Sequence, residues 1–196
     1  MAIGMFANQK IYIHGYDRSG IINQVNIEAR NEVQDCTSIN DTTRIYLAGL
    51  NDIDFSVEGF YDYAADDIDW NLIGTDNKII SFFESGAAAT SVGYSIPATI
   101  TEYSPSFRVG ELRAFRISAK SNRKFVKVMT PDGKVTINAS GEGTARQIGA
   151  VASDQKLYSF VHILAASGTD PTLIIKVRSD DNPDFTTTIL RLTHTT

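Results

Sequence analysis

The clearest pattern in the chain is a strict alternation of apolar and polar residues in the stretch 51–58. The apolar positions are Ile53, Phe55 and Val57. The polar positions between and beside them are Asp52, Asp54, Ser56 and Glu58. A period of two predicts a β-strand with one buried face and one face in water. We therefore expect a strand within residues 44–61, kinked at Gly49, with its apolar face in the core.

Shorter stretches of the same kind recur along the chain. Further strands are predicted at residues 11–13, 21–29, 91–103, 111–121, 124–129, 157–165, 172–179 and 186–193. Turn-forming sequences separate many of them, among them the Thr-Pro-Asp-Gly sequence at 130–133. Many short strands with a turn about every ten residues predict a mainly β fold, a sandwich or a barrel.

The stretch 62–84 has a different spacing. Ile68 and Leu72 are four residues apart, and so are Ile79 and Phe83, which is the spacing of one face of a helix. Helical structure is therefore expected at residues 77–84 and, as a single turn, at residues 66–72. Residues 31–41 and 85–90 are expected to be loops. A domain boundary is predicted near 131–145, which divides the chain into parts 1–130 and 131–196.

The net charge of −5 is distributed unevenly. Residues 1–100 carry 5 basic and 14 acidic side chains, whereas residues 101–196 carry 13 and 9. An acidic region on one copy could attract a basic region on the next and so favour self-association. An equally good explanation is that both regions are simply solvated and bind no partner. The basic run 108–127 also contains aromatic residues, a combination found in single-strand nucleic-acid binders. The alternation instead favours a charged surface towards another subunit, formed by Arg113, Arg116 and Lys120.

The sequence contains no convincing catalytic, cofactor or metal site. The carboxylates within 62–69 lack the spacing of a calcium loop and are better explained by a solvated face or a helix start. The Gly-Glu-Gly sequence at 141–143 lacks the residues of a nucleotide loop, and the three histidines match no catalytic motif. The single cysteine, Cys36, excludes an internal disulfide. We expect no enzyme activity, no cofactor and no metal.

The N-terminal residues 1–9 are expected to form an arm. Met5 and Phe6 are too apolar for a free tail, so we expect them to contact this subunit or a neighbour. The start shows no basic segment followed by an apolar core, which predicts a protein made in the cytoplasm without a signal peptide. No apolar run approaches the ~20 residues that span a bilayer, so no membrane contact is expected.

Two blocks of sequence resemble the tail tube (major tail) proteins of long-tailed bacteriophages. The first block, 11–62, contains GYDxSGxIN at 15–23, DxTxxxDTT at 35–43, LxGLxD at 47–52 and FSxxGFYD at 55–62. The second block, 141–192, begins GxGTARQIGAVASDQKLY and continues into HILAASGTDPTL. The two blocks together cover more than half of the chain. The second is typical of phage tail proteins but is less specific by itself.

The resemblance implies a structural virion protein with a β-sandwich and one flanking helix. Subunits of this family form rings, usually of six copies, whose strands join in an inner β-barrel, and the rings stack into a tube that conducts DNA. It implies an acidic lumen, here lined by Asp52, Asp54, Ser56 and Glu58. It also implies contacts between rings, here made by Met5, Phe6, Asp35, Asn40 and Asp41. The expected partners are further copies, other tail proteins, and DNA only in transit.

Several alternatives remain open. The ring is expected to be a hexamer, unless residues 131–196 form a second tube-like domain, which would favour a trimer with pseudo-sixfold symmetry. A capsid decoration protein or a tail terminator would form a single layer without polymerising. A host- or carbohydrate-binding β-module would need an exposed aromatic platform. Trp70, Tyr61 and Tyr63 are its candidates, although their position favours a core or interface role.

Overall fold

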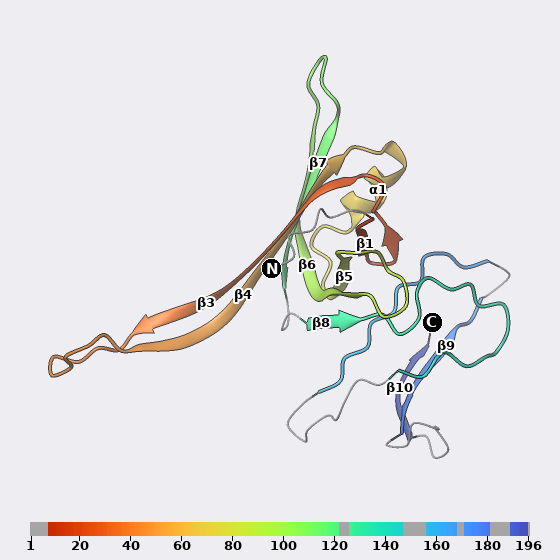
Figure 1. The fold of residues 1–196 in the computed structure, drawn as a ribbon. Helices are drawn as coiled ribbons and strands as arrows, with labels where there is room; N and C mark the ends of the chain where they lie inside the picture. The colour runs from red at the N-terminus through yellow and green to blue at the C-terminus, as the bar shows by residue number, and fades with distance from the viewer. Residues whose placement is uncertain (1–7, 122–125, 147–155, 168–170, 181–188, 196) are drawn as a thin grey trace.

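The computed structural model describes residues 8–121, 126–146, 156–167, 171–180 and 189–195. These residues form a mainly β, antiparallel structure with one α-helix (Figure 1), as the sequence predicts. The elements are β1 (Lys10–Ile13), β2 (Tyr16–Asp17), β3 (Ile22–Asp35), β4 (Tyr46–Phe60), α1 (Tyr63–Asn71), β5 (Lys78–Phe83), β6 (Val92–Ser106), β7 (Ala114–Ser121), β8 (Val126–Met129), β9 (Ile174–Ser179) and β10 (Ile189–Thr195).

The main sheet has the strand order β2-β1-β5-β6-β7-β4-β3, and β8 also pairs with β6. The long strand β6 connects its two halves. Residues 93–98 of β6 pair with β5, whereas residues 98–106 pair with β7. A register shift between Ile100 and Glu102 marks a bulge in β6, and bulges bend a strand and increase its twist. The sheet can therefore curve around a single core.

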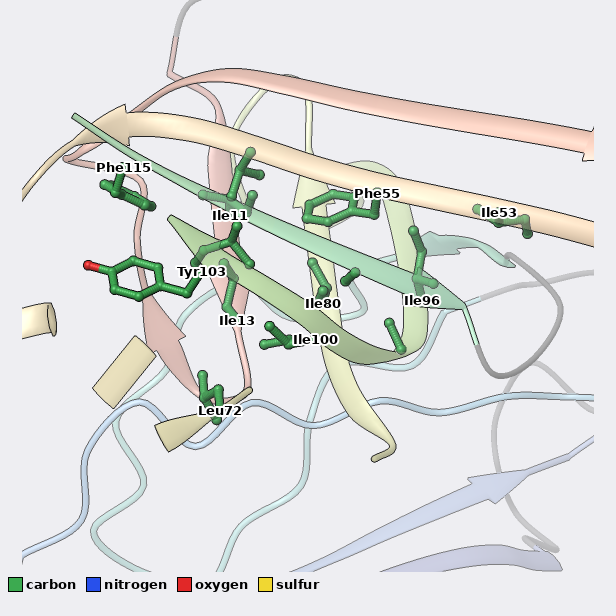
Figure 2. Close-up of a cluster of buried hydrophobic side chains, with 14 residues drawn as sticks. Ile11, Ile13, Ile53, Phe55, Leu72, Ile80, Ile96, Ile100, Tyr103 and Phe115 are labelled. Carbon is green, nitrogen blue, oxygen red and sulfur yellow. The ribbon is translucent and has the colours of Figure 1, made fainter. Parts of the chain in front are cut away.

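The core lies on the inner face of this curved sheet. Figure 2 shows side chains from β1, β4, β5, β6 and β7 meeting in one cluster, with Leu72 from the end of the helix. The predicted inward positions are confirmed in β4, where Phe55 is 2 % exposed, and in β7. These positions are Ile53, Phe55, Val57, Phe115, Ile117 and Ala119. Burying a side chain the size of Phe55 contributes about 2–3 kcal/mol to stability.

Helix α1 is tied to the sheet by polar contacts. Asp62 is its N-cap and accepts a hydrogen bond from the Ala64 backbone N–H, which confirms the helix-start interpretation for this carboxylate. Asp69 forms a 2.6 Å ion pair with Arg18, in which both side chains are buried. The Tyr103 hydroxyl donates to Asp66 across 2.7 Å. Burial beside that carboxylate raises the pKa of Tyr103.

The prediction of a helix over residues 77–84 is wrong, because this stretch contains strand β5. The turn of helix expected at residues 66–72 is confirmed, since it lies in α1 (Tyr63–Asn71) and its C-cap Leu72. β5 is covered on both faces, because Ile80 and Phe82 face the core while Ser81 lies under the segment that carries His162. A strand buried on both faces is a nearly continuous apolar run. Periodicity cannot distinguish such a run from a buried helix.

Two further boundaries differ from the expectation. Residues 31–35, predicted as loop, continue β3 as far as Asp35, because β4 supplies a ladder partner along that length. Residues 157–165, predicted as a strand, form no strand, since no neighbouring strand pairs with this segment among the described residues. His162 is half-buried there, as expected. The segment contacts the main sheet through side chains instead.

The strands β3 and β4 extend beyond the rest of the sheet as a long two-stranded ribbon (Figure 1). Pairing between β4 and β7 spans only Asp54–Phe60, so the start of β4 is paired with β3 alone. A register shift opposite Gly49 confirms the predicted kink as a β-bulge. Glu32 packs against Gly49, where an added Cβ would lie 3.2 Å from the Glu32 Cβ.

The C-terminal strands β9 and β10 form a separate two-stranded sheet. A cavity of about 590 Å³ lies between this region and the main sheet, lined from the main sheet by Ile79, Pro97 and Val126. The main sheet thus comes from residues 10–129 and the second sheet from residues 174–195. Whether residues 131–196 are an independent domain stays a prediction.

Candidate functional site

The outer face of the four strands β6, β7, β4 and β3 is a continuous polar surface, which we call the polar face. Its four predicted positions, Asp52, Asp54, Ser56 and Glu58, lie in the middle of it on β4. The ladder registers place Gln24, Asn26, Glu28 and Arg30 beside them on β3. On the other side lie Arg116, Ser118 and Lys120 of β7, and then Glu102 and Ser104 of β6.

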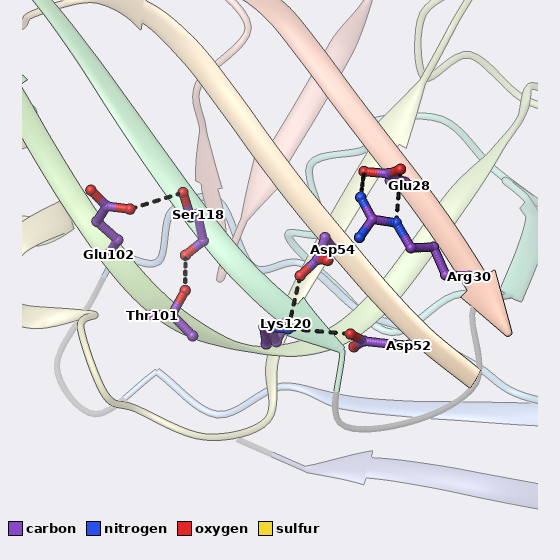
Figure 3. Close-up of polar contacts among 8 residues, drawn as sticks. All are labelled: Glu28, Arg30, Asp52, Asp54, Thr101, Glu102, Ser118 and Lys120. Atoms are coloured by element: carbon purple, nitrogen blue, oxygen red, sulfur yellow. Dashed lines mark hydrogen bonds and ion pairs between the residues drawn. The ribbon is translucent and has the colours of Figure 1, made fainter. Parts of the chain in front are cut away.

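Ion pairs link the strands of the polar face (Figure 3). The Lys120 ammonium lies 3.2 Å from carboxylate oxygens of both Asp52 and Asp54. Arg116 lies 3.7 Å from Glu58 on the neighbouring strand, whereas Arg30 lies 2.6 Å from Glu28 within β3. The Asp54 and Asp52 carboxylates raise the pKa of Lys120, so it stays charged. Exposed pairs of this kind contribute little to stability, about 0–1 kcal/mol each.

The polar face unites two sets of residues that the sequence treats as separate. Arg116 and Lys120, predicted to form a surface towards another subunit, project from the same face as the predicted lumen residues and neutralise part of their charge. Five carboxylates and three cations therefore share this face. Arg113 lies elsewhere, with its guanidinium over the ring of Phe107. The role of each set in an assembly stays a prediction.

Sequence reasoning missed three charged members of the polar face. Glu28 and Arg30 belong to β3, where the alternation of 21–29 was visible but its polar side was not connected with that of β4. Glu102 follows Thr101 at the bulge of β6, and both side chains are exposed there. A bulge breaks the period of two, so the alternation rule assigns Glu102 to the wrong face.

The tip of the ribbon is a hydrogen-bonded turn that uses the DxTxxxDTT sequence. Asp35 accepts from the hydroxyl and the backbone N–H of Thr37, and Asp41 accepts from the Ser38 backbone N–H. These bonds lower the pKa of both carboxyl groups. Asn40 is exposed at the same tip. The predicted contacts of Asp35, Asn40 and Asp41 between rings stay a prediction, and Met5 and Phe6 lie outside the described residues.

A serine and a histidine meet under the C-terminal segment. The Oγ of Ser81 lies 2.7 Å from Nε2 of His162 and 2.7 Å from Oγ of Ser95. Nδ1 of His162 accepts a hydrogen bond from the Gly15 backbone N–H, so the ring proton is on Nε2 and is donated to Ser81. A histidine in this tautomer cannot accept the Ser81 proton. The cluster therefore joins the segment to the sheet rather than activating a nucleophile.

This cluster predicts acid-sensitive stability. Burial, with a smaller effect of His14, lowers the pKa of His162 to about 4, against about 6.5 in an unfolded chain. The unfolded chain therefore binds more protons below pH 6.5, and stability falls as the pH falls from 6.5 to 4, by up to about 3 kcal/mol. Urea unfolding at several pH values measures this. The variant His162→Gln keeps a donor and an acceptor and should flatten the profile; an unchanged slope would contradict the assignment.

The remaining candidate residues, the carboxylates of 62–69 and the aromatic residues of α1, either have a hydrogen-bond or ion-pair partner or are exposed to solvent. Of the carboxylates in 62–69, Asp62, Asp66 and Asp69 have the partners given above, and no group of three potential metal ligands occurs among the described residues. Tyr63 and Trp70 are 84 % and 61 % exposed on α1, so neither is a core residue, and the interface role that was the other expectation stays a prediction. In the described part of the chain, no helix is long and apolar enough to cross a membrane.

Comparison with known proteins finds the same fold among solved structures of tail and tube components. No family model and no curated protein matches the chain. Several solved structures, by contrast, match the chain. The tail of an empty gene transfer agent (GTA) particle, computed with helical refinement and C6 symmetry, is 15% identical, with a TM-score of 0.50 over 65% of this chain and 99% of that chain.

Two further structures match with a TM-score of 0.52. The tube-terminating cap of the anti-feeding prophage is 12% identical, over 66% of this chain and 92% of that chain. The sheath/tube terminator of the extracellular contractile injection system PVC is 13% identical, over 65% of this chain and 97% of that chain. Identities this low bear on the fold alone. This chain therefore shares its fold with proteins of a GTA tail, of the anti-feeding prophage cap and of a contractile injection system.

Proposed function

We propose that this protein is a tail tube subunit, a non-enzymatic structural protein of a phage-like virion that forms rings stacking into a DNA-conducting tube. The observation that carries the proposal is the polar face. Four adjacent antiparallel strands bury one side and carry polar and charged side chains along the other. Closing such a sheet with those of neighbouring copies would produce a barrel with a polar lumen and without exposed edge strands.

The charges of the polar face suit a surface that DNA passes without binding. Lysine and arginine contacts to phosphates dominate protein–DNA affinity. On this face each of the three cations already faces a carboxylate, and the carboxylates are in excess. A lumen built from it would repel phosphate weakly and offer no unpaired cation to hold it. Asp52, Asp54, Ser56 and Glu58 are the central lumen residues in this proposal.

Negative-stain electron microscopy of the purified protein over a concentration series tests this function. We expect hollow tubes with regular striations, because ring formation and stacking are both concentration-dependent associations. Rings of six copies are expected, in keeping with the C6 symmetry of the similar GTA tail; three copies per ring would favour the pseudo-sixfold alternative. A protein that remains monomeric at every concentration would contradict the proposal.

A tail terminator is the second candidate, because two of the similar structures are a tube-terminating cap and a sheath/tube terminator. A terminator would close one end of a tube and contact other tail proteins on one side only. The same micrographs separate the two candidates. Single rings that never stack would favour the terminator, whereas continuous tubes would favour the tube subunit.

A further inference from the structure

Helix α1 presents a side that the rest of the described chain leaves uncovered. Tyr63 and Trp70 are seven residues apart, so they lie on the same side of the helix, with Asp67 between them. Tyr63 is 84 % exposed, Trp70 is 61 % exposed, and Asp67 is exposed as well. We call these three residues the helix face. Aromatic side chains are enriched at protein interfaces, because one ring offers both an apolar body and a polar tip.

The surroundings of the helix face are acidic. The stretch 62–71 contains four aspartates and no basic residue. Arg18 pairs with Asp69. The other three, Asp62, Asp66 and Asp67, form no ion pair with a basic side chain among the described residues. The last turn of α1 also lacks a basic residue, although the C-terminal end of a helix carries a partial negative charge. A cationic partner would therefore be stabilised at this face.

The outward side of the β9–β10 sheet has the opposite character. Ile174, Lys176 and Arg178 are exposed and alternate with half-buried residues along β9. The ladder places Leu190 of β10 beside Arg178, and Leu190 is 51 % exposed. We call these four residues the strand face. β9 and β10 together contain three basic residues and no acidic residue. A two-stranded sheet is only marginally stable in water by itself, so a partner on this face would also stabilise it.

The two faces do not meet within one copy. Ile175 and His194, on the inner side of the β9–β10 sheet, line the cavity against the main sheet. Successive side chains of a strand point to opposite sides, so Lys176 points away from the main sheet. Helix α1 is held to the main sheet by its contacts with Arg18 and Tyr103 (Figure 1). A contact between the two faces must therefore join two different copies.

We propose that the helix face of one copy binds the strand face of a second copy. Such a contact goes beyond the proposed function, because it would join copies in a tube and in a terminator ring alike. Carboxylates meet cations across it, and a cation over the ring of Trp70 gains a cation–π interaction. The contact is heterologous, so each copy can bind one neighbour through each face. The uneven charge of the chain thereby gains a structural role.

Carbodiimide crosslinking of the full chain tests the contact directly. The reagent activates a carboxylate, and a lysine amine in contact with it then forms an amide without a spacer. We expect mass spectrometry to find Lys176 linked to Asp62, Asp66 or Asp67. In a mixture of isotope-labelled and unlabelled protein, linked peptides of different label should occur, because they come from two copies. The variant Lys176→Arg keeps the charge without a reactive amine, so it should assemble normally and lose this crosslink.

Charge reversal tests whether the contact contributes to assembly. Lys176→Glu and Trp70→Ala change exposed side chains, so folding should be unaffected. We expect each to raise the concentration of half-maximal assembly about tenfold or more, measured by sedimentation velocity. Lys156→Glu is the matched control, because it makes the same charge change at an exposed position outside both faces. It should assemble like the unmodified protein.

A charge exchange gives a stricter test. The double variant Asp67→Lys/Lys176→Glu swaps the two charges and should recover association, an outcome that a general loss of stability would not produce. The contact is overturned if Lys176→Glu assembles normally, or if no crosslink joins peptides of different label; tubes that still form would then leave the tube function intact. The crosslink in small oligomers that never stack would support the contact and count against the tube. A protein that stays monomeric at every concentration would refute both.

Discussion

Replacing Arg18 by Met should lower the free energy of unfolding by about 3–5 kcal/mol, because it leaves the Asp69 carboxylate buried without its partner. The two side chains are 8 % and 2 % exposed and 2.6 Å apart. Burial raises the pKa of Asp69, and the Arg18 guanidinium opposes this shift. Natural domains have a total stability of about 5–15 kcal/mol, so the loss is large. Urea unfolding followed by circular dichroism measures it.

Two variants control this prediction. Asp67→Asn removes an exposed carboxylate from the same helix and should change stability by less than about 0.5 kcal/mol. The double variant Arg18→Met/Asp69→Leu replaces the buried ion pair by apolar side chains and should recover most of the loss. A loss below about 1 kcal/mol for Arg18→Met alone would show that the pair does not hold helix α1 to the sheet.

The second large effect concerns the polar face. Reversing Asp52, Asp54 and Glu58 to Lys should make assembled particles retain DNA, because the face would then carry six cations and two carboxylates per copy. The new lysines would also face Lys120 and Arg116 instead of neutralising them. Binding through phosphates weakens steeply with salt, on the order of 10³-fold between about 50 and 200 mM. Co-sedimentation of DNA with the particles over this range measures the effect.

A neutral triple variant, Asp52→Asn/Asp54→Asn/Glu58→Gln, serves as the control for that experiment. It removes the carboxylate charges without adding cations, so retention should lie between that of the unmodified protein and that of the lysine variant. This variant places no new cation beside Lys120, so it adds no charge repulsion between β4 and β7. It should therefore form rings as readily as the unmodified protein. If particles of the lysine variant retain no more DNA than unmodified particles, these three residues do not line the lumen.

The contrast between the two effects follows from the surroundings of the charges. Arg18 and Asp69 are removed from water, so loss of one partner costs a desolvation energy that nothing replaces. Lys120 and its carboxylates remain in water, where solvent and salt screen them. Substitutions on the polar face should therefore change what the assembled face binds, whereas substitutions at Arg18 should change whether the chain folds.

The sequence alone determined the strands whose two faces differ. β4 and β7 alternate between core and water, and a period of two specifies such strands locally. It also indicated the helix start at Asp62 and the kink at Gly49, because caps and bulges depend on neighbouring residues. Only the tertiary structure decided that residues 78–83 are a strand, since both of their faces are covered by distant segments.

For the candidate site, too, the sequence predicted one part and the tertiary structure decided the other. The alternation found the acidic row of β4, whereas the register of β3, β4 and β7 decided that Arg30, Arg116 and Lys120 share its face. The bulge at Thr101 turned Glu102 towards that face as well. The buried pair of Arg18 and Asp69 and the contact of Ser81 with His162 join residues 51 and 81 positions apart. Pattern rules describe neighbours along the chain, and these contacts exist only once the sheet has curved around its core.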